Sequence, residues 1–260
     1  MTLLNEALRA AHAPAPRPAA AARTVLVVGA GGALGSAVLE QALGGGGFRQ
    51  VQALVAAPVA PALATFHPLP EAQLARRGTQ ADTAFVVFDR ERHVNGRDEA
   101  FVRPQPEQLP GIARRLHAAG VRHLLVVLPH APGALPQALQ QGLASLDEQA
   151  VAALDFRHVL FVRSPQAPAG ATARGLQRLA HWMLGQLQMM LPQQHQPVRA
   201  TRLAAFAVHL ARRLPDAAPG TRVVPPEVSW LASQVDEAEV ARAWLAGEPL
   251  PTVAGRRPRY

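Results

Sequence analysis

Four glycines follow a short apolar run near the start of the chain, a combination suited to binding phosphates. The run Val25–Val28 is mostly β-branched, and a helical pattern continues from the glycines to Leu43. A strand, a glycine turn and a helix in this order are typical of the opening unit of a dinucleotide-binding fold. The helix N-terminus offers free N–H groups and a positive dipole end to the phosphates. The glycines are Gly29, Gly31, Gly32 and Gly35.

The spacing of these glycines predicts which backbone positions approach a ligand. The form Gly29-x-x-Gly32-x-x-Gly35 fits better than Gly-x-Gly-x-x-Gly, which requires a glycine where the chain has Leu34. One glycine permits the tight turn, one lets the backbone approach a pyrophosphate, and one lets the helix pack on the strand. We therefore predict a nucleotide site at this turn. The alternative is a turn whose glycines serve packing alone.

Few other side chains offer chemistry. The chain has no cysteine, which excludes disulfides, thiol chemistry and Cys-ligated zinc. Its ten histidines show no metal-ligand spacing, and no HExxH motif occurs. His130 follows the predicted strand 123–128 and is the candidate acid–base residue at the cleft. The alternative for His130 is an exposed loop histidine.

Composition and charge restrict the class of protein. The 260 residues, 49% of them hydrophobic, suit one large α/β domain, or one domain with a small cap. The net charge of +8 rests on arginines scattered among acids, since lysine is absent, and aromatics are only 5%, so we expect no nucleic-acid partner. No apolar run reaches membrane-spanning length, and residues 1–22 lack the apolar core of a signal peptide. We therefore expect a soluble, cytoplasmic protein with no membrane contact.

Alternating strand and helix patterns predict a Rossmann-like α/β fold, a doubly wound parallel sheet with a small C-terminal helical cap. We expect a flexible Ala/Pro-rich segment at 1–22, a nucleotide-binding core at 23–165, and a mostly helical portion at 166–260 that completes the same domain. Strands are predicted at 25–28, 51–55, 65–69, 83–88, 123–128, 158–162 and 223–228. Helices are predicted at 32–43, 71–77, 107–119, 137–154, 171–191, 201–214 and 236–245.

Three stretches beyond the glycine turn carry a family resemblance. They are R-D-E-A-F-V at 97–102, A-A-G-V-R-H-L-L-V-V-L at 118–128 and L-D-F-R-H-V-L-F-V-R-S-P at 154–165. Over roughly residues 24–233 the chain resembles the atypical short-chain dehydrogenase/reductase group, most closely its Tat-interacting-protein-type and NmrA-like branches. This resemblance is specific for the fold and implies an NAD(P)-binding Rossmann protein.

The resemblance also allows the family's catalytic groups to be tested against this chain. Hydride transfer in the superfamily uses a Tyr-x-x-x-Lys helix and a serine after the fifth strand. The chain has no lysine, and its only tyrosine is Tyr260, the last residue. The matching positions fall near Gln140 and Ala144, and the serine position falls on Leu128–Pro129. Tyr-x-x-x-Lys catalysis is therefore excluded.

The cofactor site implied by the resemblance is incomplete. The end of the second strand, Val55–Ala57, lacks the acidic residue of NAD sites and the arginine of NADP sites. The fourth strand ends in Phe88–Asp89, where the family usually has a glycine, and Asp89 either caps a loop or marks a changed ligand. We predict NAD(P), NADP being one option, as the ligand. The predicted binding residues are Gly29, Gly31, Gly32, Ala33, Leu34, Gly35, Phe88 and Asp89.

Three functions remain open on the sequence. The first is a nucleotide sensor or scaffold that binds NAD(P) without these catalytic groups. The second is an oxidoreductase or isomerase that uses His130 or a bound water. The third is a protein-interaction module that has lost cofactor binding and uses the Met-rich helix 171–191 and the arginine-rich tail 255–260. The partner is accordingly a nucleotide, an unknown small molecule or a protein.

Overall fold

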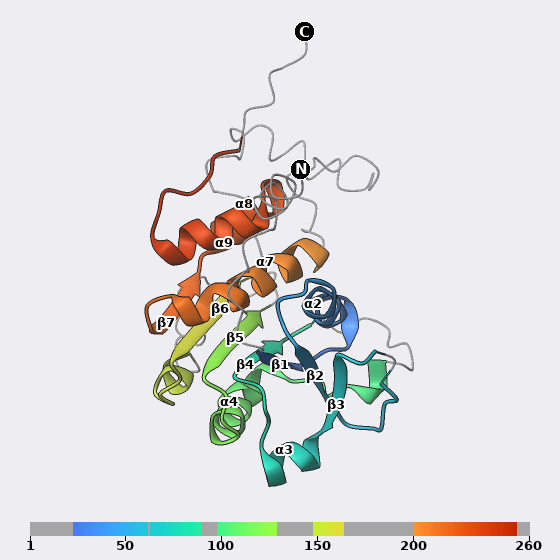
Figure 1. The fold of residues 1–260 in the computed structure, drawn as a ribbon. Helices are drawn as coiled ribbons and strands as arrows, with labels where there is room; N and C mark the ends of the chain where they lie inside the picture. Colours follow the sequence, from blue (N-terminus) through green and yellow to red (C-terminus); the bar gives the residue numbers. More distant parts are fainter. Residues whose placement is uncertain (1–22, 62, 90–97, 129–147, 164–199, 254–260) are drawn as a thin grey trace, which may run out of the picture.

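A parallel seven-stranded sheet lies at the centre of the structure, a computed structural model that describes residues 23–61, 63–89, 98–128, 148–163 and 200–253. The strand order is β3-β2-β1-β4-β5-β6-β7 (Figure 1). The chain changes direction across the sheet between β1 and β4, which creates a topological switch point at the carboxyl edge. The strands are β1 (Thr24–Val28), β2 (Gln50–Val55), β3 (Phe66–Pro70), β4 (Thr83–Val87), β5 (His123–Leu128), β6 (His158–Arg163) and β7 (Gly220–Val224).

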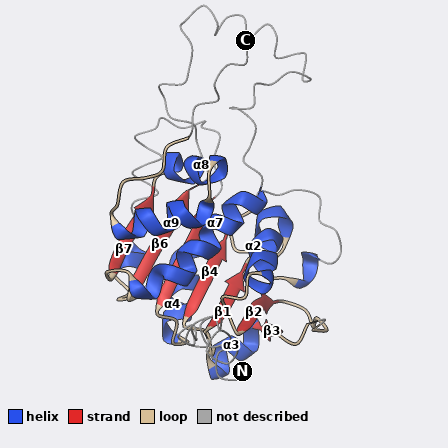
Figure 2. Ribbon diagram, turned by 45° about the horizontal axis from the view of Figure 1, so that its top comes forward, coloured by secondary structure: helices blue, strands red, loops and turns tan. Residues whose placement is uncertain are grey.

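Helices cover both faces of the sheet (Figure 2). On β1, Val25 and Val27 point into one core layer, and Leu26 and Val28 point into the other, because side chains alternate along a strand. The first layer packs against α2, α7, α8 and α9, and the second packs against α3, α4 and the helical residues 148–152. The helices are α2 (Gly32–Gly44), α3 (Glu71–Arg77), α4 (Leu109–Ala118), α7 (Ala200–Arg213), α8 (Pro226–Gln234) and α9 (Glu237–Ala246).

The predicted Rossmann-like, doubly wound α/β fold with C-terminal helices is confirmed. The strand predicted at 223–228 is wrong in its bounds, since β7 ends at Val224 and α8 begins at Pro226. Proline has no N–H for a strand ladder, but its fixed φ suits the first position of a helix. The predicted helix 171–191 lies outside the described residues. The domain boundaries at 22 and 165 stay predictions.

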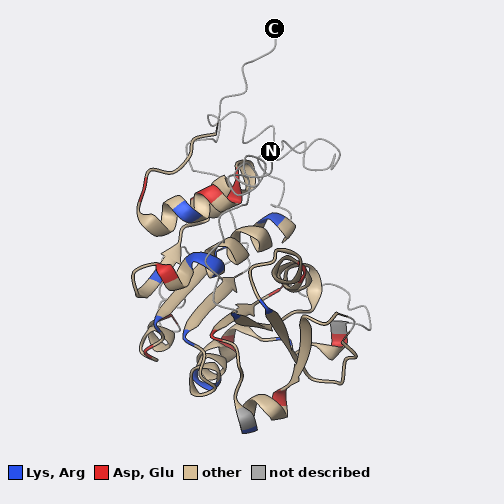
Figure 3. Cartoon of the chain, viewed as in Figure 1, with Lys and Arg blue, Asp and Glu red and all other residues tan. Residues whose placement is uncertain are grey.

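Basic and acidic residues are interspersed over several helices and loops of the described residues (Figure 3). Four ion pairs join arginines to acids there: Arg115–Glu71, Arg163–Glu148, Arg202–Glu237 and Arg242–Glu248. None of the described helices is long and apolar enough to cross a membrane.

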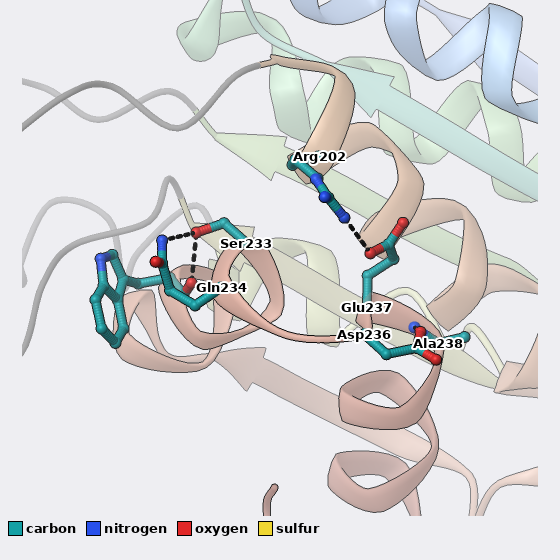
Figure 4. A network of polar contacts seen from close by, with 7 residues as sticks. Arg202, Ser233, Gln234, Asp236, Glu237 and Ala238 are labelled. Carbon is teal, nitrogen blue, oxygen red and sulfur yellow. Dashed lines mark hydrogen bonds and ion pairs between the residues drawn. The ribbon is translucent and has the colours of Figure 1, made fainter. Parts of the chain in front are cut away.

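A polar contact joins the start of α9 to α7 (Figure 4). Asp236 caps α9, and its carboxylate accepts the Ala238 N–H at 2.8 Å. The next residue, Glu237, accepts a 2.8 Å bond from Arg202 of α7. The ion pair thus joins the first turn of α9 to α7, and the two helices also pack together in the first core layer.

Candidate nucleotide-binding site

The turn between β1 and α2 requires glycine at the positions that the spacing indicated. Gly29 and Gly32 have φ values of 86° and 79°, a region that side chains rarely adopt. A Cβ on Gly29 would overlap the Val87 carbonyl oxygen of β4, and a Cβ on Gly35 would overlap the Gly29 carbonyl oxygen. The glycines therefore bring α2 close to β1 and place the start of the helix at the switch point.

Gly31, the remaining glycine of the turn, does not need the conformational freedom of glycine. It is the N-cap residue of α2, with extended dihedral angles (φ −79°, ψ 163°) that any residue can adopt. Having no side chain, it cannot cap the helix, and the first turn of α2 contains no acid. The N–H groups at the start of α2 therefore depend on a partner from elsewhere.

Asp89 supplies that partner. Its Oδ2 accepts the Leu34 N–H at 2.6 Å, although the two residues are 55 positions apart in the sequence. Asp89 lies two residues beyond the end of β4, and it is exposed. A Cβ on Gly32 would lie 2.6 Å from the same carboxylate oxygen. A carboxylate thus rests on the helix N-terminus, where the dipole favours negative charge and where Rossmann proteins bind a pyrophosphate.

Phe88 directly before Asp89 faces the opposite way. Its N–H donates to the Val127 carbonyl at 3.0 Å and so continues the β4–β5 pairing by one residue. Its side chain is 1% exposed and packs in the core layer on the α3–α4 side. Of the two residues after β4 that were predicted to touch the cofactor, Asp89 alone has its side chain at the glycine turn.

Residues 100–102 close over the end of β2. The Ala100 carbonyl accepts the N–H groups of Ala56 at 2.8 Å and Ala57 at 3.3 Å, and the Val102 N–H donates to Leu54 at 3.1 Å. These backbone groups stand where an NAD site has its ribose-binding acid. The residues of this segment carry part of the family resemblance, but their spacing does not predict this pairing.

Pro104 continues that segment to the glycine turn. It is buried, and its Cδ and Cγ lie 3.1 and 3.2 Å from the position of a Cβ on Gly29. Phe101 forms an isolated antiparallel bridge with Val55. The chain therefore covers the carboxyl ends of β1 and β2 with its own residues.

Several sequence predictions fall at or beyond the limits of the described residues. His130, Pro129, Gln140 and Ala144 lie outside them. Leu128 ends β5 and pairs in register with Arg163 of β6. Arg163 forms an ion pair with Glu148 at 2.8 Å. The first residue of the Arg-Ser-Pro sequence at 163–165 is therefore paired with an acid at the carboxyl edge of the sheet. Within the described ranges, no group of three His, Asp or Glu residues could hold a metal ion.

A pair of buried histidines lies at the opposite, amino edge of the sheet. His123 and His158 begin β5 and β6, and the His158 Nε2–H is placed to donate to the Ala217 carbonyl at 3.1 Å. Burial, with a smaller contribution from His158, lowers the pKa of His123 to about 4. Burial also lowers the pKa of His158. The sequence analysis missed this pair, whose only signal was a histidine at the same position of neighbouring predicted strands.

Comparison with known proteins assigns the chain to no family. No protein-family model and no curated protein matches the chain. Solved structures similar to it are Rossmann-fold proteins of the dehydrogenase and epimerase type, at low identity. A Rossmann-fold NAD(P)-binding family protein from Shigella flexneri is 15% identical over 75% of this chain and 87% of that chain, with a TM-score of 0.40.

Two further structures cover more of the sequence. The Bordetella bronchiseptica enzyme WbmG, in complex with NAD, is 16% identical over 93% of this chain and 84% of that chain (TM-score 0.42). Glucuronic acid dehydrogenase from Chromohalobacter salexigens is 15% identical over 88% of this chain and 91% of that chain (TM-score 0.44). At such identities the function must be inferred from the residues of the site.

Proposed function

We propose that this chain is an atypical short-chain dehydrogenase/reductase-like protein that binds NAD(P) at the Gly29–Gly35 turn and acts as a nucleotide sensor or scaffold. The observation that carries the proposal is the geometry of this turn. Gly29 and Gly32 have positive φ, and Gly35 packs on the Gly29 carbonyl, which leaves the start of α2 at the switch point. This arrangement is the one through which Rossmann proteins hold a pyrophosphate.

The backbone of the turn fits a dinucleotide, and two side-chain features do not. The N–H groups at the start of α2 would hold the pyrophosphate, with Gly32 permitting its close approach. The carboxylate of Asp89 already accepts the Leu34 N–H, and a second anion there is repelled. The end of β2 offers the ribose no carboxylate.

The proposed role of sensor or scaffold rests on the lack of the superfamily's Tyr-x-x-x-Lys pair in these 260 residues. A bound nicotinamide supplies hydride transfer, but the carbonyl that accepts the hydride also needs a proton from an acid such as tyrosine. The lack of lysine does not depend on any alignment, and Tyr260 is the last residue. A protein that binds the cofactor without turning it over can report the nucleotide level or use the nucleotide to stabilise its fold.

A second candidate function is an interaction module that has lost cofactor binding. The contact that favours it is the bond from Leu34 N–H to Asp89, because a helix N-terminus that is already capped no longer needs a phosphate. The oxidoreductase or isomerase alternative rests on His130, which lies outside the described residues.

Calorimetric titration of the full chain with NADH and NADPH tests the proposal. We expect saturable binding that Gly32→Asp abolishes, since the new side chain would start 2.6 Å from Asp89 Oδ2 at a strained φ. Gly111→Asp is the matched control, because Gly111 is exposed in α4 and a Cβ there has no neighbour within 4 Å. No binding at millimolar NADH or NADPH would favour the interaction module. Turnover that is lost in His130→Ala would favour the enzyme.

A further inference from the structure

The carboxylate of Asp89 occupies the place where a phosphate group would bind. It accepts the Leu34 N–H at 2.6 Å, in the first turn of α2, as a phosphate oxygen does at a helix N-terminus. It also lies against Gly32, the glycine whose missing side chain permits close approach. We propose that Asp89 is an autoinhibitory side chain, a built-in substitute for phosphate that a nucleotide must displace before it binds. This proposal rests on the nucleotide-binding function proposed above.

Charge is the first reason why Asp89 opposes the ligand. A pyrophosphate and a carboxylate cannot share the same N–H groups, and at contact distance the two anions repel each other. The resemblance implies a glycine at the end of the fourth strand, where this chain has Phe88 and Asp89. Asp89 therefore weakens binding in two ways: it takes up a donor, and it adds a negative charge.

The second reason is that α2 has no cap from its own N-cap residue or from its first turn. Gly31 cannot cap the helix, and residues 32–34 contain no acid, so Asp89 serves the N-terminus that a bound phosphate would otherwise serve. The protein thereby keeps the start of α2 stable without ligand. When a nucleotide displaces Asp89, its phosphate takes the place of the Asp89 carboxylate at the start of α2.

Asp89 lies at the surface, so displacing its side chain does not require the core to open. Its side chain is exposed and follows the last residue of β4 by two positions. The neighbouring Phe88 is 1% exposed and anchors the backbone in the core. Rotation of the Asp89 side chain would thus uncover the start of α2 while the sheet and the core layer under Phe88 stay in place.

Titration of NADPH into four full-length proteins tests this role. Asp89→Asn keeps the shape and removes the charge, and Asp89→Ala removes the whole group. We expect NADPH to bind at least about tenfold tighter to both than to the wild type, with the larger gain in Asp89→Ala. The fourth protein, Asp216→Asn, removes an equal charge from an exposed residue that precedes β7, beyond the amino edge. It should bind as the wild type does. A fifth protein, with Gly32→Asp added to Asp89→Ala, serves as a further control and should lose the gain.

Each outcome separates this inference from the proposed function. If all four proteins bind NADPH equally, the nucleotide function stands and the role of Asp89 is overturned. If none binds NADPH, the nucleotide function fails, and inorganic pyrophosphate is then the probe, with the amide resonance of Leu34 as the readout. A pyrophosphate-dependent shift in Asp89→Ala but not in the wild type supports the inference. An unmoved Leu34 resonance in Asp89→Ala overturns it.

Discussion

His123 and His158 share a hydrogen bond in the core, with their Nδ1 atoms 2.9 Å apart, at the amino ends of two neighbouring strands. Since the His158 Nε2–H points to the Ala217 carbonyl, its Nδ1 accepts and His123 Nδ1–H donates. This arrangement requires a neutral His158 ring, because its Nδ1 must keep a lone pair to accept the bond. The pair lies at the edge of the sheet away from the glycine turn, so its effect should be on stability.

The histidine pair predicts a loss of stability in mild acid. Because the pKa of His123 is lowered from 6.5 to about 4, the unfolded chain binds this proton first. The stabilisation is fully present above about pH 6.5 and declines as the pH falls through 4, by at most about 3 kcal/mol. Urea unfolding between pH 7 and 4 should show a shallower dependence in His123→Gln. His67→Gln, at an exposed histidine, should follow the wild type; equal slopes in all three proteins would refute the assignment.

Because Asp89 caps α2, its removal should lower the stability of the protein. Asp89→Ala leaves the Leu34 N–H to solvent and should lower the free energy of unfolding by about 1 kcal/mol. Asp89→Asn should lose less, because an asparagine side chain also caps helices. Urea unfolding at low salt measures both. Together with tighter NADPH binding, this loss would show that one contact stabilises the free protein at the expense of ligand affinity.

A side chain at Gly35 should destabilise the protein by overpacking the contact between α2 and β1. In Gly35→Ala the new methyl group would overlap the Gly29 carbonyl oxygen, which is backbone and cannot rotate away. We expect a loss of about 1–3 kcal/mol in thermal or urea unfolding, as for other overpacked sites. Gly111→Ala has no such neighbour, and should be neutral or stabilising by up to about 1 kcal/mol. A Gly35→Ala protein as stable as the wild type would mean that α2 can move away from β1.

The ion pairs should differ in strength according to their exposure. In the Arg163–Glu148 pair, the side chains are 33% and 14% exposed, and a double-mutant cycle should give a coupling of about 1–2 kcal/mol. The Arg202 side chain is 53% exposed, and the Arg202–Glu237 cycle should give less than about 1 kcal/mol. The first coupling should persist in high salt and the second should fade. The reverse order would show that the carboxyl-edge pair is not held in place.

Local patterns were sufficient for most of the fold. The β-branched run Val25–Val28, the helical spacing of 71–77 and the apolar run 123–128 each predicted an element at nearly its observed bounds. These elements follow from residue periodicity and from glycine and proline, which act over a few positions. The one shifted strand, at 223–228, contains two prolines at the point where β7 gives way to α8.

The contacts of the candidate site could not be predicted in the same way. The bond from Leu34 to Asp89 joins residues 55 apart, and the pairing of 100–102 with β2 depends on how a loop crosses the sheet edge. From the sequence, Asp89 could be either a loop cap or a sign of a changed ligand. The structure shows that its carboxylate caps the start of α2, at the carboxyl edge of the sheet where the nucleotide is proposed to bind.

Two kinds of information thus define this protein. The sequence alone establishes the glycine spacing of the β1–α2 turn and the absence of lysine and cysteine from these 260 residues, because these depend on residue type and short spacing. The folded chain adds that Asp89 meets Leu34 and that His123 meets His158. These contacts arise where strands far apart in sequence become neighbours, so strand order and register determine them.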